Sequence, residues 1–316
     1  MTEPHARVDP LQELQFALAE GDALLPPSRL AHTVLDTALA SRPAGRPIDE
    51  PPPISAVEAF RRAVASLDRL LDSLETDEWR RPVVRGLDGQ ELVGHLIGVE
   101  HDFLAGLHAP HGAQADADHV ASTDAAAAAQ GGRPPSETLG EWRTAVATTL
   151  AALADAETSP PQLGEVIGLH GLHMPLGSLL IARTFELWTH EEDIRRATAR
   201  PVQAPDAASL RLMTDLAVTM LPAGMRRAGR GVRGRSARIV LTGPGGGTWL
   251  TDLDPDTVPD GARPQRPAHV RIVLDAVDFC RLVANRVDAA TLAPVVTGDG
   301  SLAQDLFAGA ASLALD

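Results

Sequence analysis

The sequence predicts a two-domain protein of the α+β class, in which a four-helix bundle precedes a smaller domain of strands and helices. The chain has 316 residues, which is long for one compact domain and comfortable for two. Between residues 55 and 200, apolar side chains recur at three- and four-residue spacing, as on helices that bury one face. After Pro201, short apolar runs separated by a glycine-rich turn replace that pattern, which is typical of strands.

Composition excludes several classes of protein. The net charge is −14, from 28 basic and 42 acidic residues, and a protein that coats nucleic acid needs a basic surface instead. No run approaches the roughly 18 apolar residues of a membrane span, and the first residues lack the pattern of a secretory signal. The single cysteine, Cys280, permits no internal disulfide. We therefore expect a cytoplasmic protein with a small-molecule substrate and with neither nucleic acid nor membrane as partner.

Residues 1–53 are predicted to form a separate arm. Two short amphipathic helices are expected at about 10–25 and 28–40, and the proline-rich stretch from Arg42 to Pro53 is a boundary that cannot be helical. A packing arm or a dimer contact is the favoured interpretation, and we expect a monomer or a homodimer.

Residues 54–200 are predicted to be the bundle. The first helix runs from Ser55 to about Leu74, and the second begins at Asp88, a capping residue with Glu91 three positions on, and continues to Leu107. The alanine-rich stretch 108–132 holds at most a short helix. The third helix begins at Ser136, and the fourth spans about 176–198, before Arg200-Pro201.

Residues 201–316 are predicted to form the α+β domain. A helix is expected at about 204–220, followed by a hairpin of strands 237–242 and 248–253 around the turn 243–247. That glycine-rich turn precedes a strand and has no Lys-Ser/Thr after it, so it does not match a phosphate loop. A third strand is predicted at 270–274, with helices at 276–285 and 301–310.

The candidate site lies on the fourth predicted helix. At about 100° per residue, Glu186 and His190 project in the same direction one turn apart, and Asp193 joins them. His95, in an apolar stretch of the second helix, can face this pair across the bundle. Two imidazoles and one carboxylate with a fourth position open are the ligands of a catalytic divalent metal such as zinc. A helix-surface ion pair is the alternative interpretation of Glu186 and His190.

Other polar residues leave alternatives open. Asp102 and Asp193 are each either an acceptor that orients a ligand histidine or an ordinary structural polar residue. His170 and His173 are a less favoured source of a ligand, because their segment is interpreted as a connection. Cys280 is expected to be buried packing. A group of arginines is either an anion site or, as we favour, a solvated linker: Arg226, Arg227, Arg230, Arg233, Arg235 and Arg238.

Two regions of the chain resemble a known family. The segments 86–100, with Gly94-His95-Leu96, and 186–197, with Glu186-Leu187-Trp188-Thr189-His190, resemble the mycothiol-dependent maleylpyruvate isomerase family. The segments 278–286 and 297–303 resemble its second domain. The resemblance spans roughly 55–316 and implies a DinB-like metal-binding four-helix bundle followed by a sterol-carrier-like domain. The absence of lysine and tyrosine suggests a high-GC bacterial source, compatible with mycothiol, a thiol of actinobacteria.

The resemblance implies a site and a reaction. Zinc would be held by His95, Glu186 and His190, mycothiol would be the cofactor, and Arg286 would hold an anionic substrate. A metal-activated thiolate would add to an electrophilic double bond, permit rotation and leave, which is a cis–trans isomerisation. The alternatives are a mycothiol S-transferase and a non-catalytic binding or regulatory protein with the same fold. Glu191-Glu192 after His190 and the arm before the bundle depart from the family pattern, and the substrate is therefore left open.

Overall fold

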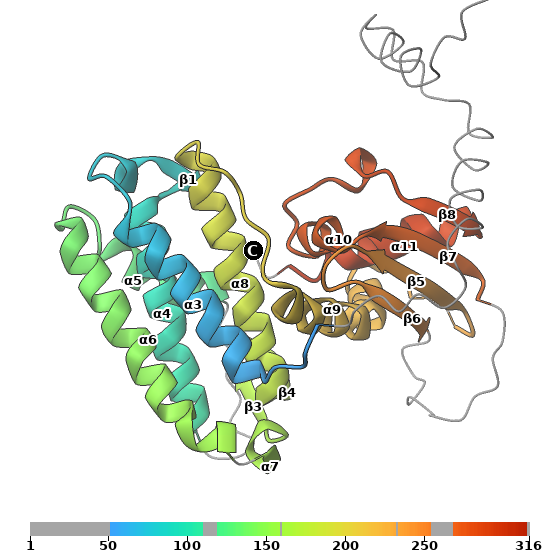
Figure 1. Ribbon diagram of the computed structural model, residues 1–316, viewed down its shortest axis with the longest axis horizontal. Helices are drawn as coiled ribbons and strands as arrows, with labels where there is room; N and C mark the ends of the chain where they lie inside the picture. The colour runs from blue at the N-terminus through green and yellow to red at the C-terminus, as the bar shows by residue number, and fades with distance from the viewer. Residues whose placement is uncertain (1–50, 110–118, 159, 232, 254–267, 315–316) are drawn as a thin grey trace, which may run out of the picture. The chain divides into compact units, whose positions relative to one another are not determined.

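The computed structural model describes residues 51–109, 119–158, 160–231, 233–253 and 268–314. The two helices predicted before residue 50 lie outside these residues. Four long helices form the bundle: α3 (Ala56–Asp72), α4 (Gly89–His108), α6 (Pro135–Thr158) and α8 (Leu176–Ala197). Figure 1 shows them packed side by side, and the contacts of α3 with α8 and of α4 with α6 agree. The predicted α+β class is confirmed.

Local sequence signals set where these helices begin. The Ser55 side chain accepts a hydrogen bond from the Glu58 backbone N–H at the start of α3. At the start of α4, Asp88 and Glu91 form a reciprocal capping box, as their spacing predicts. The fourth helix, α8, starts directly after Pro175. The two helices that carry the candidate metal ligands therefore begin close to where the sequence places them.

A short helix, α5 (His119–Ala128), packs closely against α4. A Cβ atom at Gly94 would lie 2.6 Å from the side chain of Gln130 and 2.8 Å from the backbone oxygen of Ala126. At Gly98 it would lie 3.2 Å from Thr123. The glycines of α4 thus allow the backbone of α5 to approach, and this approach brings Thr123 next to His95.

Two small hairpins connect the bundle helices. The first pairs β1 (Pro82–Val84) with β2 (Leu87–Asp88), and follows the 3₁₀ turn η1 (Glu78–Arg80). The second follows the short helix α7 (Pro160–Leu163) and pairs β3 (Val166–Leu169) with β4 (Leu172–Pro175). His170 and Gly171 form its two-residue turn with φ of +48° and +74°, as the twist of a hairpin favours. The sequence interpretation of this segment as a simple connection missed the hairpin.

The described residues of the C-terminal part form a sheet and three helices. The sheet has the order β6-β5-β7-β8, with β5 and β7 parallel and the other pairs antiparallel. Alternate residues of β5 and β7 are buried and the residues between them are more exposed, so one face of the sheet lies against the helices. The strands are β5 (Ser236–Thr242), β6 (Gly247–Asp252), β7 (Val270–Asp275) and β8 (Val295–Gly298); the helices are α9 (Ala207–Arg227), α10 (Ala276–Val283) and α11 (Gly300–Ala311), with a 3₁₀ turn η2 (Ala289–Thr291).

Two hydrophobic cores hold these elements together. The first is built around Phe60, Trp142 and Leu187 in the bundle, and the second contains Ile239 and Trp188. The consecutive residues Leu187 and Trp188 of α8 therefore belong to different cores, and α8 packs against both α3 and α9. Because there is one core in each part, we propose that residues 54–200 and 201–316 are separate domains, as the sequence predicts.

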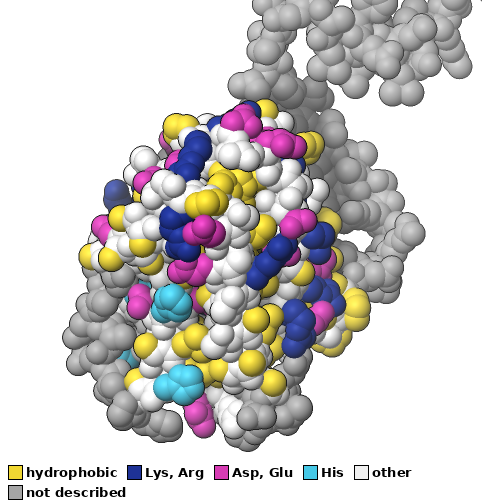
Figure 2. Space-filling view, turned by 90° about the vertical axis from the view of Figure 1, so that its left-hand side faces the viewer, with side chains coloured by type: hydrophobic (Ala, Val, Ile, Leu, Met, Phe, Trp, Pro, Cys, Tyr) yellow, Lys and Arg dark blue, Asp and Glu magenta, His cyan; other side chains and the backbone are white. Residues whose placement is uncertain are grey.

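The surface carries charges of both signs. Figure 2 shows arginine and carboxylate side chains interspersed on the face that it draws, rather than gathered by sign. The ion pairs of Arg143 with Asp68 and Asp72, both at 2.7 Å, are examples of this mixing. Within the described residues, we find no helix with the length and apolar character to cross a bilayer.

Candidate metal centre

The structure brings His95 of α4 together with Glu186 and His190 of α8. Each residue offers one possible ligand atom, and these atoms lie within 4.8 Å of one another. The His95 Nε2 atom is 3.4 Å from Glu186 Oε1, and the two imidazole rings are edge to face with centroids 5.6 Å apart. The histidines are 2% and 1% exposed, and the Glu186 side chain is 15% exposed. Helical spacing predicts that Glu186 and His190 share a face, and His95 faces them across the bundle as the sequence allows.

Thr123 of α5 orients His95. Its hydroxyl lies 2.6 Å from His95 Nδ1, and its side chain is fully buried. This contact leaves Nε2 as the atom that His95 offers toward Glu186. Of the two interpretations left open for Asp102, the structure favours the ordinary polar residue, because its carboxylate lies 2.9 Å from Nε2 of His170 rather than beside His95. Thr123 was missed because it stands in the alanine-rich stretch where the sequence pattern is weakest.

Asp193 orients His190. Its Oδ2 atom lies 3.2 Å from His190 Nδ1, so the second imidazole also offers its Nε2. Arg286 of the C-terminal part donates from Nε and Nη2 to the two Asp193 oxygens, both at 2.9 Å. Burial favours protonation of Asp193, but His190 and Arg286 outweigh it and hold the pKa of Asp193 below its ordinary value. The orienting role that the sequence suggests for Asp193 is the one that its position supports.

Arg286 therefore has a partner different from the one expected. The family resemblance implies that it holds an anionic substrate, whereas in the structure its guanidinium pairs with Asp193, which is only 9% exposed. Arg286 thus acts on His190 through Asp193. Direct contact between Arg286 and a substrate remains a prediction.

Glu186 is held by a buried charge network that the sequence analysis missed. Arg183, one turn earlier on α8, donates from Nη1 to Glu186 and from Nη2 to Glu100 Oε1, the latter at 2.6 Å. The Thr149 hydroxyl donates to the other Glu100 oxygen at 2.7 Å. Although burial opposes the charged form, Glu186 and Glu100 raise the pKa of Arg183. The presence of Glu100 among apolar residues of the second helix was the available signal.

The donor set fits a divalent cation. Burial lowers the pKa of His95, despite the nearby Glu186 carboxylate, and the neutral imidazole is the form that binds metal. Two imidazole nitrogens and one carboxylate are a common set for catalytic zinc, which keeps a fourth position for water or substrate. Hydrogen bonds to the outer ring nitrogens of the histidines fix which nitrogen faces the metal.

The remaining candidates fall outside this cluster of three. His170 lies in the β3–β4 turn near Asp102, and His173 lies on β4. Cys280 is fully buried, and burial raises the pKa of its thiol, as expected of a packing residue. In the arginine-rich segment, Arg235 is paired with Asp299, and Arg227 lines a cavity.

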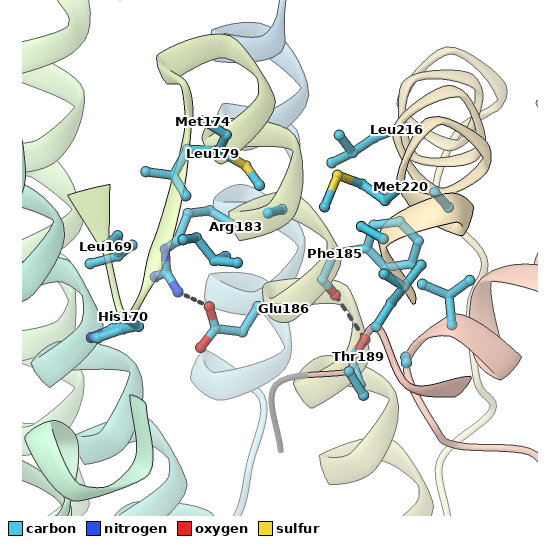
Figure 3. Close-up of a pocket in the computed structure, with 18 of the residues that line it drawn as sticks. Leu169, His170, Met174, Leu179, Arg183, Phe185, Glu186, Thr189, Leu216 and Met220 are labelled. Atoms are coloured by element: carbon cyan, nitrogen blue, oxygen red, sulfur yellow. Dashed lines mark hydrogen bonds and ion pairs between the residues drawn. The ribbon is translucent and has the colours of Figure 1, made fainter. Parts of the chain in front are cut away.

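That cavity adjoins two of the three candidate ligands, Glu186 and His190. It has a volume of about 280 Å³ and includes Arg183, Glu186 and His190 in its wall. Figure 3 shows Glu186 facing into it beside Arg183, with His170 on one side and Met220 on the other. The arrangement places a candidate metal-ligand cluster at the wall of a cavity of small-molecule size.

Comparisons with known proteins find one matching family model and two similar solved structures. Residues 60–195 match the family model described as the mycothiol maleylpyruvate isomerase N-terminal domain. Two solved structures are similar. The first is that of the mycothiol-dependent maleylpyruvate isomerase, which is 14% identical in sequence. The match covers 77% of this chain and 91% of that chain, with a TM-score of 0.49. A histidine-to-alanine mutant of it has 14% identity, coverages of 76% and 91% and a TM-score of 0.47. No curated protein sequence matches significantly.

Proposed function

We propose, from the premise that residues 60–195 belong to the mycothiol maleylpyruvate isomerase N-terminal domain family, that the chain is an enzyme dependent on a divalent metal and on mycothiol. The reaction is cis–trans isomerisation of an electrophilic double bond in a small molecule. Zinc is the metal that this donor set favours. The observation that carries the proposal is the buried cluster of His95, Glu186 and His190, whose ligand atoms lie within 4.8 Å of one another.

The metal and the thiol would supply the chemistry of the site, and the protein would position the metal ligands. When bound, the metal supplies the positive charge that keeps a thiol deprotonated near neutral pH, and mycothiol supplies that thiol, whose reversible addition permits rotation about the double bond. His95 and His190 present their Nε2 atoms because Thr123 and Asp193 occupy the Nδ1 atoms. Arg183 holds the Glu186 carboxylate in place.

The cavity wall contributes apolar surface beside the candidate ligands. Leu179 and Phe185 of α8 and Leu216 of α9 line it beside the ligands. In a site with little water, electrostatic interactions between a thiolate, a metal and a substrate are stronger than in solution. The same apolar wall favours the second candidate function, a mycothiol S-transferase, because it suits electrophiles with an apolar body. The non-catalytic alternative depends on residues 1–50, which lie outside the described residues.

Metal analysis of purified variants tests the proposal. His95→Ala and His190→Ala are each expected to lose most of the bound metal, whereas His101→Ala, an exposed histidine on the same helix α4, is expected to keep it. Full metal content in both ligand variants overturns the proposal.

The type of reaction is tested with mycothiol and a panel of electrophiles. An isomerised product without a thiol adduct supports the isomerase, and a stable adduct supports the S-transferase instead. Absence of both reactions with metal-loaded protein contradicts both enzymatic functions.

A further inference from the structure

The walls of the cavity beside the metal ligands are mainly apolar. The hairpin β3–β4 contributes Leu169 and Met174, α8 contributes Phe185, and α9 contributes Leu216 and Met220. Figure 3 shows these side chains on both sides of the space into which Glu186 faces. A ligand that fills this space therefore exchanges water for hydrocarbon over most of its length.

The charged groups close to the ligands are already matched by other protein groups. Arg183 is bound by both Glu100 and Glu186. His170, also in the wall, lies 2.9 Å from the Asp102 carboxylate. Arg183 and His170 are therefore committed to carboxylates of the protein, and neither side chain is left to pair with a second carboxylate of a ligand.

Arg227 differs from the other charged residues of the wall. It stands in the last turn of α9 and is exposed, and it lines the cavity from a helix other than those that carry the metal ligands. Within the described residues, no ion pair or hydrogen bond joins it to an acidic side chain. The Arg227 guanidinium can therefore donate hydrogen bonds to one carboxylate of a ligand.

We propose that the electrophilic substrate is amphipathic, with an apolar body that fills the cavity and a single anionic group that pairs with Arg227, rather than a compact dianion. This inference rests on the proposed function, because it takes the cavity beside the metal ligands as the substrate site. The volume of about 280 Å³ equals that of roughly nine liquid waters, which is enough for a short aliphatic chain or a single ring.

Calorimetric titration of the metal-loaded full chain, without thiol, tests the substrate class. The ligands are butanoate, hexanoate, octanoate and maleate. Burial of each additional methylene is expected to tighten binding by about fourfold, and octanoate is expected to bind more tightly than maleate. A chain-length series with constant affinity, or maleate as the tightest ligand, overturns the inference. A carboxylate held only by the metal would produce that constant affinity.

Matched variants locate the two ends of the ligand. Arg227→Gln is expected to weaken hexanoate binding roughly tenfold and to leave 1-hexanol binding unchanged, while Arg226→Gln, its exposed neighbour, changes neither. Met220→Glu is expected to abolish the chain-length dependence, and Thr219→Glu, exposed on the same helix, to preserve it. Equal effects of Arg227→Gln and Arg226→Gln contradict the assigned anionic end. Equal effects of Met220→Glu and Thr219→Glu contradict the assigned apolar end.

Metal content measured on the same samples separates this inference from the proposed function. Protein that retains metal but prefers maleate refutes the substrate class alone. Protein that binds the apolar series but holds no metal refutes the metal-dependent function and leaves the ligand class of the cavity standing.

Discussion

Replacement of Arg183 by methionine is expected to destabilise the protein strongly. Arg183 is 2% exposed and joins Glu100, which is fully buried, to Glu186. Methionine fills a similar volume but supplies no charge, so the Thr149 hydroxyl is the one donor that the described part of the chain still offers to the buried Glu100 carboxylate. Removal of one partner from a buried ion pair costs about 3–5 kcal/mol, which is a large share of the 5–15 kcal/mol typical of a folded protein.

A double-mutant cycle identifies the cause. Glu100→Gln leaves an uncharged side chain that could still accept a hydrogen bond from Thr149. The double variant Glu100→Gln/Arg183→Met is therefore expected to lose less free energy of unfolding than the two single variants lose together. The expected difference is at least about 1.5 kcal/mol. Arg143→Met is the control, since its ion pairs with Asp68 and Asp72 are exposed and such pairs contribute about 0–1 kcal/mol.

Urea unfolding of the metal-free proteins, followed by circular dichroism, gives these free energies of unfolding. The reasoning is refuted if Arg183→Met lies within about 1 kcal/mol of the unaltered protein. It is also refuted if the two single changes add without coupling, because the loss would then come from packing rather than from a buried charge left alone.

Three further predictions follow from the packing and the helix caps. Thr123→Val removes the hydroxyl beside His95 Nδ1 and is expected to weaken metal binding about 10–100-fold, measured by competition with a chelator; an unchanged affinity contradicts the orienting role. Gly94→Ala, whose Cβ would lie 2.6 Å from Gln130, is expected to cost about 1–3 kcal/mol in urea unfolding, whereas Gly140→Ala on α6, with open space around it, is expected to stabilise by up to about 1 kcal/mol; equal effects contradict the close approach of α5. Burial alone would raise the pKa of Asp206, the residue that caps α9. Hydrogen bonds from Ser209 and from backbone N–H groups outweigh burial and hold this pKa below its ordinary value. Its stabilisation is therefore present above the unfolded-state pKa of about 3.9 and lost as pH falls through the lower folded pKa, so the cost of Asp206→Ala, about 1 kcal/mol at pH 7, is expected to shrink below about pH 4; a cost independent of pH contradicts the assigned cap.

The parts of the molecule that depend on local sequence could be predicted. The capping box at Asp88 predicts the start of α4, and helical spacing predicts that Glu186 and His190 share a face. The same periodicity places His95 inside the bundle. These features depend on residues within a few positions of one another, or on the general rule that apolar helix faces pack together.

The features that sequence reasoning missed depend on distant partners. Thr123 is 28 residues from His95, and Arg183 is 83 residues from Glu100. Neither pairing has a periodic signal, because each is set by how closely two helices approach. The β3–β4 hairpin was not predicted because His170 occupies a left-handed turn position that glycine or asparagine usually fills. The strand β8 was missed for a related reason, since it is only four residues long and pairs with β7 through the tertiary fold.

The position of α8 between the two hydrophobic cores has a mechanical consequence. Leu187 is anchored on one side of this helix and Trp188 on the other, and the turn that contains both also carries Glu186 and His190. A rotation of the helix large enough to move the two candidate metal ligands would displace Leu187 or Trp188 from the core in which it packs. The orientation of the two candidate ligands on α8 therefore depends on the packing of both cores, and not on the bundle alone.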